Sequence, residues 1–188
     1  TFDGIALGAI YALISLGYTL VYGVLRLINF AHSEVFMIGT FAALVTASGI
    51  MGVNVEDEPR TGVSMIFTLL ICLVIAMLAS AITAVLVEII AYRRLRQRGA
   101  TKLATLISAI GVSISLVELF RIITDSLPRE FPRIMEKTFL FSYAGADIRN
   151  DKVIVIIAAG LMMFALERFI TKSRLGKGIR AVSMDEST

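Results

Sequence analysis

An apolar stretch that contains glycines and runs directly into a polar cluster constrains this chain more than any other feature. Residues Gly4 to Val24 are apolar over the length of a membrane span, and a second apolar stretch covers Val35 to Val53. Between them lies the sequence Asn29-Phe-Ala-His-Ser-Glu34. Polar side chains between two membrane-length segments are costly in lipid, so they usually face partner helices or line a pathway. The pattern indicates a membrane protein and makes transport the first function to consider.

The composition also favours a membrane-embedded chain. Hydrophobic residues make up 57% of the sequence and the mean hydropathy is +0.83, whereas roughly 45–50% apolar residues are usual in soluble domains. A span needs about 20 apolar residues, so four or five spans would occupy most of the 188 residues. We therefore expect a single all-α transmembrane domain over residues 1–188, a polytopic helical bundle without a separate soluble domain.

Five apolar segments are long enough to cross a bilayer. We expect them at residues 4–24, 28–53 (or 35–53), 63–90, 103–124 and 153–170. All three prolines fall outside these segments, as expected if each span is an unbroken helix. Two stripes of small residues repeat every four positions: Gly4, Gly8 and Ala12 in the first span, and Ala76, Ser80 and Ala84 in the third. Such stripes let helices approach closely in lipid, so both are predicted to be packing faces.

Clustered basic residues predict the orientation. Residues 92–102 and 168–180 hold five Lys or Arg each, whereas residues 54–62 hold one. Cytoplasmic loops carry an excess of Lys and Arg, so we place the first two segments in the cytoplasm. Residues 125–152 also hold five, matched by five acidic residues, which weakens this assignment without reversing it. The pI of about 9.2 then reflects topology, and no nucleic-acid partner is expected.

The polar cluster Asn29–Glu34 has two readings. A charge at the bilayer centre would cost about 2.5–3.5 kcal/mol, so these residues must face water, an interface or other helices. They could form a helix break at membrane depth that borders a substrate path, as in transporters with discontinuous helices. They could instead form a short cytoplasmic turn in which Asn29 or Ser33 caps the next helix, with Thr1 on the outer side. The residue pattern leaves both readings open.

Catalytic and metal chemistry find little support in the residues. His32 and Cys72 are the single histidine and the single cysteine, so we expect neither a metal site nor a disulfide within the chain. A membrane enzyme would need His32 and Glu34 as acid and base, and no nucleophile or metal set that would complete such a site is found nearby. An ion-coupled secondary transporter would need a titrating residue within a span, for which Glu118 is the candidate. We expect Glu118 to form a surface ion pair with Arg121 instead.

The stretch from Thr171 to Ser183 alternates basic and small residues. One reading is a topology signal that also contacts anionic lipid. The other is a short cytoplasmic helix that docks into a partner protein. The charge pattern does not separate the two readings.

Five blocks of sequence resemble one family in the same order: Gly8–Ile14, Tyr18–Gly23, Ile28–Glu34, Leu106–Ile114 and Ser173–Val182. They are similar to the permeases of branched-chain amino acid ABC importers of the LivH type. The resemblance covers nearly the whole chain, and five blocks in register are far more specific than any one of them.

The resemblance implies a permease subunit, not an enzyme, that moves branched-chain or related neutral amino acids by ATP-driven alternating access. Urea or short amides are the alternative substrates within the family. It implies two cytoplasmic ATPase subunits, a second related permease and an external substrate-binding protein as partners, in the plasma (inner) membrane of a prokaryote. ATP would be used by the partner subunits, so no cofactor is expected in this chain.

The resemblance also implies roles for particular residues. The substrate pathway would be bordered by Asn29, Phe30, His32, Ser33 and Glu34. Residues 171–188 would begin the cytoplasmic segment that couples to the ATPase, through Ser173, Arg174, Leu175, Gly176, Lys177 and Arg180. Members of the family are longer than this chain, so we expect it to be the N-terminal portion of a longer permease.

Overall fold

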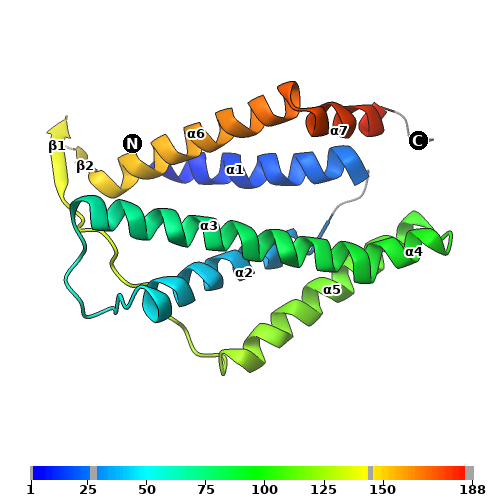
Figure 1. Cartoon of the computed structure of the whole chain (residues 1–188), viewed down its shortest axis with the longest axis horizontal. Helices are drawn as coiled ribbons and strands as arrows, with labels where there is room; N and C mark the ends of the chain where they lie inside the picture. Colours follow the sequence, from blue (N-terminus) through cyan, green and yellow to red (C-terminus); the bar gives the residue numbers. More distant parts are fainter. Residues whose placement is uncertain (1, 26–28, 144–145, 185–188) are drawn as a thin grey trace. The chain divides into compact units, whose positions relative to one another are not determined.

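The computed structural model describes residues 2–25, 29–143 and 146–184, and these residues are mainly helical. The elements are α1 (Phe2–Leu25), α2 (His32–Val45), the π-helix η1 (Thr46–Ile50), α3 (Gly62–Val87), the π-helix η2 (Glu88–Arg93), α4 (Arg94–Gln97), α5 (Lys102–Ile123), β1 (Phe139–Tyr143), β2 (Ala146–Arg149), α6 (Asn150–Lys172) and α7 (Arg174–Met184) (Figure 1). They divide into two compact units, one of residues 1–28 with 137–188 and one of residues 29–136.

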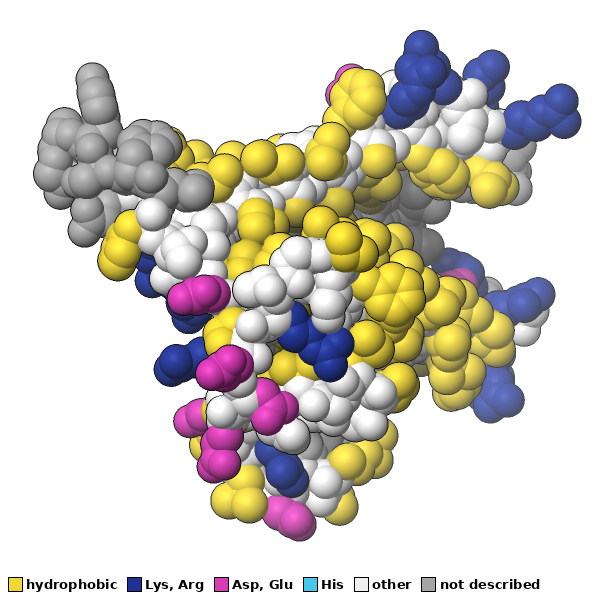
Figure 2. Space-filling model, turned by 60° about the vertical axis from the view of Figure 1, so that its left-hand side comes forward, with side chains coloured by type: hydrophobic (Ala, Val, Ile, Leu, Met, Phe, Trp, Pro, Cys, Tyr) yellow, Lys and Arg dark blue, Asp and Glu magenta, His cyan; other side chains and the backbone are white. Residues whose placement is uncertain are grey.

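Five helical segments in the described residues are long and apolar enough to cross a membrane. They cover Phe2–Gly23, His32–Ile50, Gly62–Gln97, Leu103–Ile123 and Asn150–Lys172. Hydrophobic side chains make up much of the face drawn in Figure 2, and many large apolar residues are exposed. Such exposure would be unfavourable in water, but it suits helices that contact lipid or partner helices. The prediction of an all-α polytopic membrane protein is confirmed.

Two segments differ from the sequence-based expectation. The basic segment 92–102 was expected to be a loop, but the helix continues through η2 and α4 as far as Gln97, since Arg, Leu and Gln are good helix formers. It ends where Gly99 adopts a left-handed conformation with φ of 65°, which is a common helix stop. The polar segment 125–152 contains the antiparallel hairpin of β1 and β2, which apolar periodicity did not predict.

In the unit of residues 29–136, α2 packs closely against α3 in the antiparallel direction. A Cβ atom added to Gly39 would overlap Oγ of Ser80 and would lie 3.3 Å from the backbone oxygen of Ala76. The Ser80 hydroxyl donates a hydrogen bond to the carbonyl oxygen of Val35, at 3.1 Å. The predicted packing face of the third span is thus confirmed at Ala76 and Ser80, and the absent side chain of Gly39 permits the close approach.

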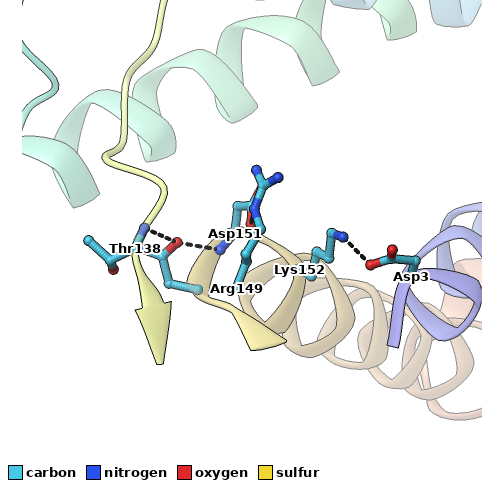
Figure 3. A network of polar contacts seen from close by, with 6 residues as sticks. Asp3, Thr138, Arg149, Asp151 and Lys152 are labelled. Carbon is cyan, nitrogen blue, oxygen red and sulfur yellow. Dashed lines mark hydrogen bonds and ion pairs between the residues drawn. The ribbon is translucent and has the colours of Figure 1, made fainter. Parts of the chain in front are cut away.

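In the unit of residues 1–28 and 137–188, α1 and α6 lie side by side and run in the same direction. An ion pair between Asp3 and Lys152 joins their N-terminal ends, as Figure 3 shows. Nearer their C-terminal ends, Thr19 of α1 and Thr171 of α6 line one cavity. The hairpin is attached at the start of α6, where the backbone N–H of Thr138 donates to Oδ1 of Asn150 at 3.2 Å.

The helix directions within each unit agree with five successive full crossings. The first and fifth spans of such a chain run in the same direction, as α1 and α6 do. The second and fourth also run in the same direction, and Val45 near the end of α2 lines a cavity with Ile123 at the end of α5. If α1 and α2 together made a single crossing, α1 and α6 would run in opposite directions. The shared direction of α1 and α6, here called the parity of the spans, therefore supports a full crossing by α2.

Candidate pathway site and coupling corner

The polar cluster lies at a break between two helices. Helix α1 ends at Leu25 and α2 begins at His32. Ala31 is the N-cap residue of α2, and no side chain caps it. The prediction that Asn29 or Ser33 caps this helix is therefore wrong. Instead, Oδ1 of Asn29 accepts a hydrogen bond from the backbone N–H of Ala31 at 3.1 Å, the local turn that Asn side chains favour.

Tyr92 anchors this turn from a distant part of the chain. Its hydroxyl donates a hydrogen bond to Oδ1 of Asn29 at 2.7 Å, and its side chain is 5% exposed. Because the backbone N–H of Ala31 is a donor only, the atom of Asn29 that it meets must be the oxygen. Within the described residues, both hydrogen bonds of the Asn29 side chain thus go to its oxygen, and its amide nitrogen can act only as a donor. Tyr92 was not among the residues predicted from sequence, since it lies 63 positions away in the π-helix η2. π-helical turns often occur at functional sites.

Glu34 places a carboxylate in the first turn of α2. Glu34 is 8% exposed. Its Oε2 atom accepts a hydrogen bond from the Ser33 hydroxyl at 3.0 Å. A buried carboxylate is costly unless it is stabilised. The first turn of a helix supplies partial positive charge from its free N–H groups, and the Ser33 hydroxyl adds a hydrogen bond.

An apolar cluster supports the break from one side. Ala31 packs with the buried residues Val87, Ala91, Tyr92 and Ala109 of α3, η2 and α5. The turn is therefore held by residues of its own unit rather than left loose between two helices. Of the predicted pathway residues, Asn29 and Phe30 precede α2, whereas His32, Ser33 and Glu34 lie in its first turn. Glu34 is buried, Asn29 and His32 are half-buried, and Phe30 and Ser33 are exposed. Their role in a pathway stays a prediction.

The length of α2 limits the depth of this site. The span His32–Ile50 has 19 residues, which at 1.5 Å per residue gives about 28 Å. The hydrocarbon core is about 30 Å thick. A helix of this length must use all of its residues to cross, so a full crossing puts Asn29–Glu34 at the membrane surface and not at its centre.

The predicted coupling residues form a tight corner between α6 and α7. Ser173 lies between the helices; its hydroxyl accepts a hydrogen bond from the backbone N–H of Gly176 at 2.8 Å, which caps α7. A Cβ atom on Gly176 would overlap the backbone oxygens of Ile170 and Phe169. Nη2 of Arg180 donates to the carbonyl oxygen of Thr171 at 3.0 Å.

The six predicted coupling residues therefore divide into two groups. Ser173, Gly176 and Arg180 hold the corner together. Arg174, Leu175 and Lys177 are exposed, and Leu175 is 71% exposed. The short helix that one reading anticipated is present as α7, and its docking to a partner stays a prediction.

The other predicted features lie as follows. Gly4, Gly8 and Ala12 are exposed on α1, whereas Ala6 is buried, so the role of this small-residue stripe as a packing face stays a prediction. Glu118 and Arg121 form the expected ion pair at 3.1 Å, with both side chains more than half exposed. Among the described residues, no group of three His, Cys, Asp or Glu side chains is arranged to hold a metal ion.

Five apolar helices, a polar turn between the first two and a basic corner after the last define a polytopic α-helical membrane protein. Residues 1–188 match the family described as the permease component of the branched-chain amino acid transport system. The chain belongs to this family, which confirms the resemblance inferred from its sequence blocks. Membership of a family of permease components also agrees with the expectation that the chain is not an enzyme.

Individual relatives support the same assignment. The chain is 34% identical over 186 residues to the high-affinity branched-chain amino acid transport system permease protein BraD of Pseudomonas aeruginosa, a match that covers 97% of the chain and 58% of BraD. It is 33% identical over 187 residues to the permease protein LivH of Escherichia coli (strain K12), with 98% of the chain and 58% of LivH covered. The chain thus spans less than two thirds of these relatives. No solved structure matches it.

Proposed function

We propose that this chain is a membrane-spanning subunit of an ABC importer that moves branched-chain or related neutral amino acids inward by ATP-driven alternating access. The observation that carries the proposal is the family match over residues 1–188, together with relatives that are branched-chain amino acid permease proteins by name. The importer would lie in the plasma (inner) membrane of a prokaryote. ATP hydrolysis would belong to two cytoplasmic ATPase subunits, so this chain would hold no cofactor.

The remaining partners follow from the same proposal. A second related permease would complete the path, and an external substrate-binding protein would deliver the solute. Basic residues mark the cytoplasmic side, so we infer that α1 runs inward from the outer side and that α7 lies in the cytoplasm. With this orientation and a full crossing by α2, Asn29–Glu34 would lie at the cytoplasmic surface, which favours the turn reading over a break at membrane depth.

The Asn29–Glu34 turn has groups that complement an amino acid. An amino acid carries a carboxylate and an ammonium group. The Asn29 oxygen already accepts hydrogen bonds from Ala31 and Tyr92, so the Asn29 amide nitrogen would donate to the substrate carboxylate. Glu34 would accept from the ammonium group. We propose that this pair borders the inner mouth of the path.

The α6–α7 corner suits force transmission. Ser173, Gly176 and Arg180 attach α7 to the end of α6, so a push on the exposed Leu175 would move both helices together. An ATPase can shift the permease between states only through contacts that differ between those states. We propose that the exposed side chains Arg174, Leu175 and Lys177 make those contacts.

The proposal is tested in proteoliposomes that contain the full-length permease and the subunits encoded beside it. Uptake of radiolabelled leucine should require both ATP and the ATPase, and Glu118→Gln should leave it unchanged. Uptake of urea but not leucine would reassign the substrate. Leucine uptake that persists without the ATPase and is lost in Glu118→Gln would instead establish the ion-coupled alternative.

A further inference from the structure

A second site lies in the unit of residues 29–136, at the end of α2 opposite the Asn29–Glu34 turn. It is a cavity of about 550 Å³ lined by α2, η1, the loop after η1, and the segment that follows α5. Small-molecule sites commonly measure about 300–1,000 Å³ and combine an apolar wall with a few polar groups. With the orientation proposed above, this cavity opens on the outer side, where substrate arrives.

The apolar part of the cavity lining, called the floor below, includes Phe41, Leu44, Val53 and Ile123. The ring of Phe41 packs against Phe120 of α5 with centroids 5.1 Å apart and a tilt of 55°, a favourable arrangement for two aromatic rings. The side chain of Val53 is buried, and its backbone N–H donates to the carbonyl oxygen of Ala47 at 2.9 Å. An aliphatic side chain could be buried here without rearrangement of the helices.

Arg60 forms hydrogen bonds both to the loop after η1 and to the segment that follows α5. Its Nη2 donates to the carbonyl oxygen of Met51 at 2.5 Å, and its Nη1 donates to Oγ1 of Thr68 at 3.0 Å. Its backbone N–H donates to the carbonyl oxygen of Ile134 at 3.1 Å. The loop after η1 and the segment after α5 are therefore held in a set position by one residue.

A strained turn precedes the part of the lining that follows α5. Asp125 and Ser126 follow α5 with φ of 53° and 56°, left-handed conformations that cost about 1–3 kcal/mol each outside glycine. Strain of this kind persists where the surrounding structure imposes it, often at functional sites. The chain then presents Arg129 and Glu130 between Pro128 and Pro132, and the two proline rings restrict the backbone on both sides.

The charged residues of the segment after α5 indicate the class of ligand. Arg129 and Glu130 are the charged residues among those that line the cavity; they are neighbours in the sequence, and both are exposed. A ligand that satisfies both must carry one negative and one positive group, and an aliphatic portion would fill the floor. Urea carries no charge and no aliphatic portion, so this site would discriminate between the two substrate classes.

We propose that this cavity is an outer binding site for a zwitterionic amino acid with a branched aliphatic side chain. Arg129 pairs with the α-carboxylate, which suits the planar guanidinium group, and Glu130 pairs with the α-ammonium group. The side chain enters the floor at Phe41 and Val53. This inference rests on the proposed function, because it names the substrate class of an importer and a place where the permease itself meets that substrate.

The test measures direct binding to the full-length permease in lipid nanodiscs without the ATPase or the substrate-binding protein. Radiolabelled leucine in equilibrium dialysis should bind saturably, and excess unlabelled urea should not displace it. Arg129→Gln and Glu130→Gln should each raise the dissociation constant by at least about tenfold, since each removes a charged hydrogen-bond partner. The matched controls are Arg133→Gln and Glu58→Gln, which make the same charge changes at exposed positions outside the lining.

Each outcome decides the inference. Loss of binding in the two lining variants alone, with thermal unfolding unchanged, supports it. It is overturned if the wild type shows no saturable binding, if the controls lose binding equally, or if urea competes as well as leucine. ATP-driven leucine uptake by the complete importer, measured in parallel, separates a failure of this binding site from a failure of the proposed function. Uptake without nanodisc binding rejects this site but not the proposed function, whereas binding without ATP-driven uptake rejects the function.

Discussion

The hydroxyl of Tyr92 donates a hydrogen bond to Oδ1 of Asn29 at 2.7 Å, across 63 positions of sequence. This bond connects η2, at the basic end of the third span, to the turn that separates α1 from α2. It also determines which atom of Asn29 remains to meet a ligand. The bond therefore links the position of η2 to the hydrogen-bonding groups that Asn29 presents before α2.

Tyr92→Phe should weaken both the turn and its function. A hydrogen bond of this kind contributes about 0.5–1.5 kcal/mol to stability, so the variant should unfold at a lower temperature. The Asn29 side chain should also reorient more freely, which should raise the leucine concentration needed for half-maximal uptake. Tyr11→Phe, at an exposed position on α1, is the control. Equal unfolding temperatures for Tyr92→Phe and the wild type would contradict the structural role of this bond.

Gly176→Ala should break the α6–α7 corner, because the new Cβ atom would overlap the backbone oxygens of Ile170 and Phe169. Backbone atoms cannot move aside as a side chain can, so we expect α7 to separate from α6 and trypsin to cleave faster after Lys177. Gly178→Ala is a matched control in the same helix, where an added Cβ meets nothing within 4 Å. That control should be neutral or stabilising by up to about 1 kcal/mol. Equal cleavage of the two variants would refute the corner.

Gly39→Ala should destabilise the α2–α3 pair by about 1–3 kcal/mol, the usual range for overpacking. The overlap is with Oγ of Ser80, so Ser80→Ala should rescue part of the loss even though it removes a hydrogen bond to Val35. A double-mutant cycle followed by thermal unfolding measures this coupling. Strictly additive effects would show that the two residues do not meet.

The parallel arrangement of α1 and α6 can be tested by cross-linking in a Cys72→Ala background. A short bis-maleimide reagent should join Asp3→Cys to Lys152→Cys, because these residues form an ion pair in the structure. The matched pair Asp3→Cys with Lys172→Cys uses the other end of α6 and should not react. Cross-linking of the second pair in preference to the first would show antiparallel helices and would remove the parity argument for a full crossing by α2.

Sequence reasoning predicted the features that depend on local composition. Apolar length alone located all five spans, and the small residues Ala76 and Ser80 marked a real packing face. It could not anticipate the helical path through Arg93 and Arg94, because clustered charge is compatible with both a loop and a helix end. The contact between Tyr92 and Asn29 was also out of reach, since neither residue carries a local signal of the other. The cavity at the end of α2 was out of reach in the same way, because it depends on Arg60 and on the strained turn at Asp125.

The corner at Ser173 has a mechanical consequence. Helix α7 has 11 residues and α6 has 23, so at 1.5 Å per residue their lengths are about 16 Å and 34 Å. If the corner stays rigid and is also the pivot, the two helices act as the unequal arms of a bent lever. A displacement at the tip of α7 is then roughly doubled at the far end of α6, next to Asp3. In the orientation proposed above, small movements at the inner surface would thus become larger ones at the outer surface.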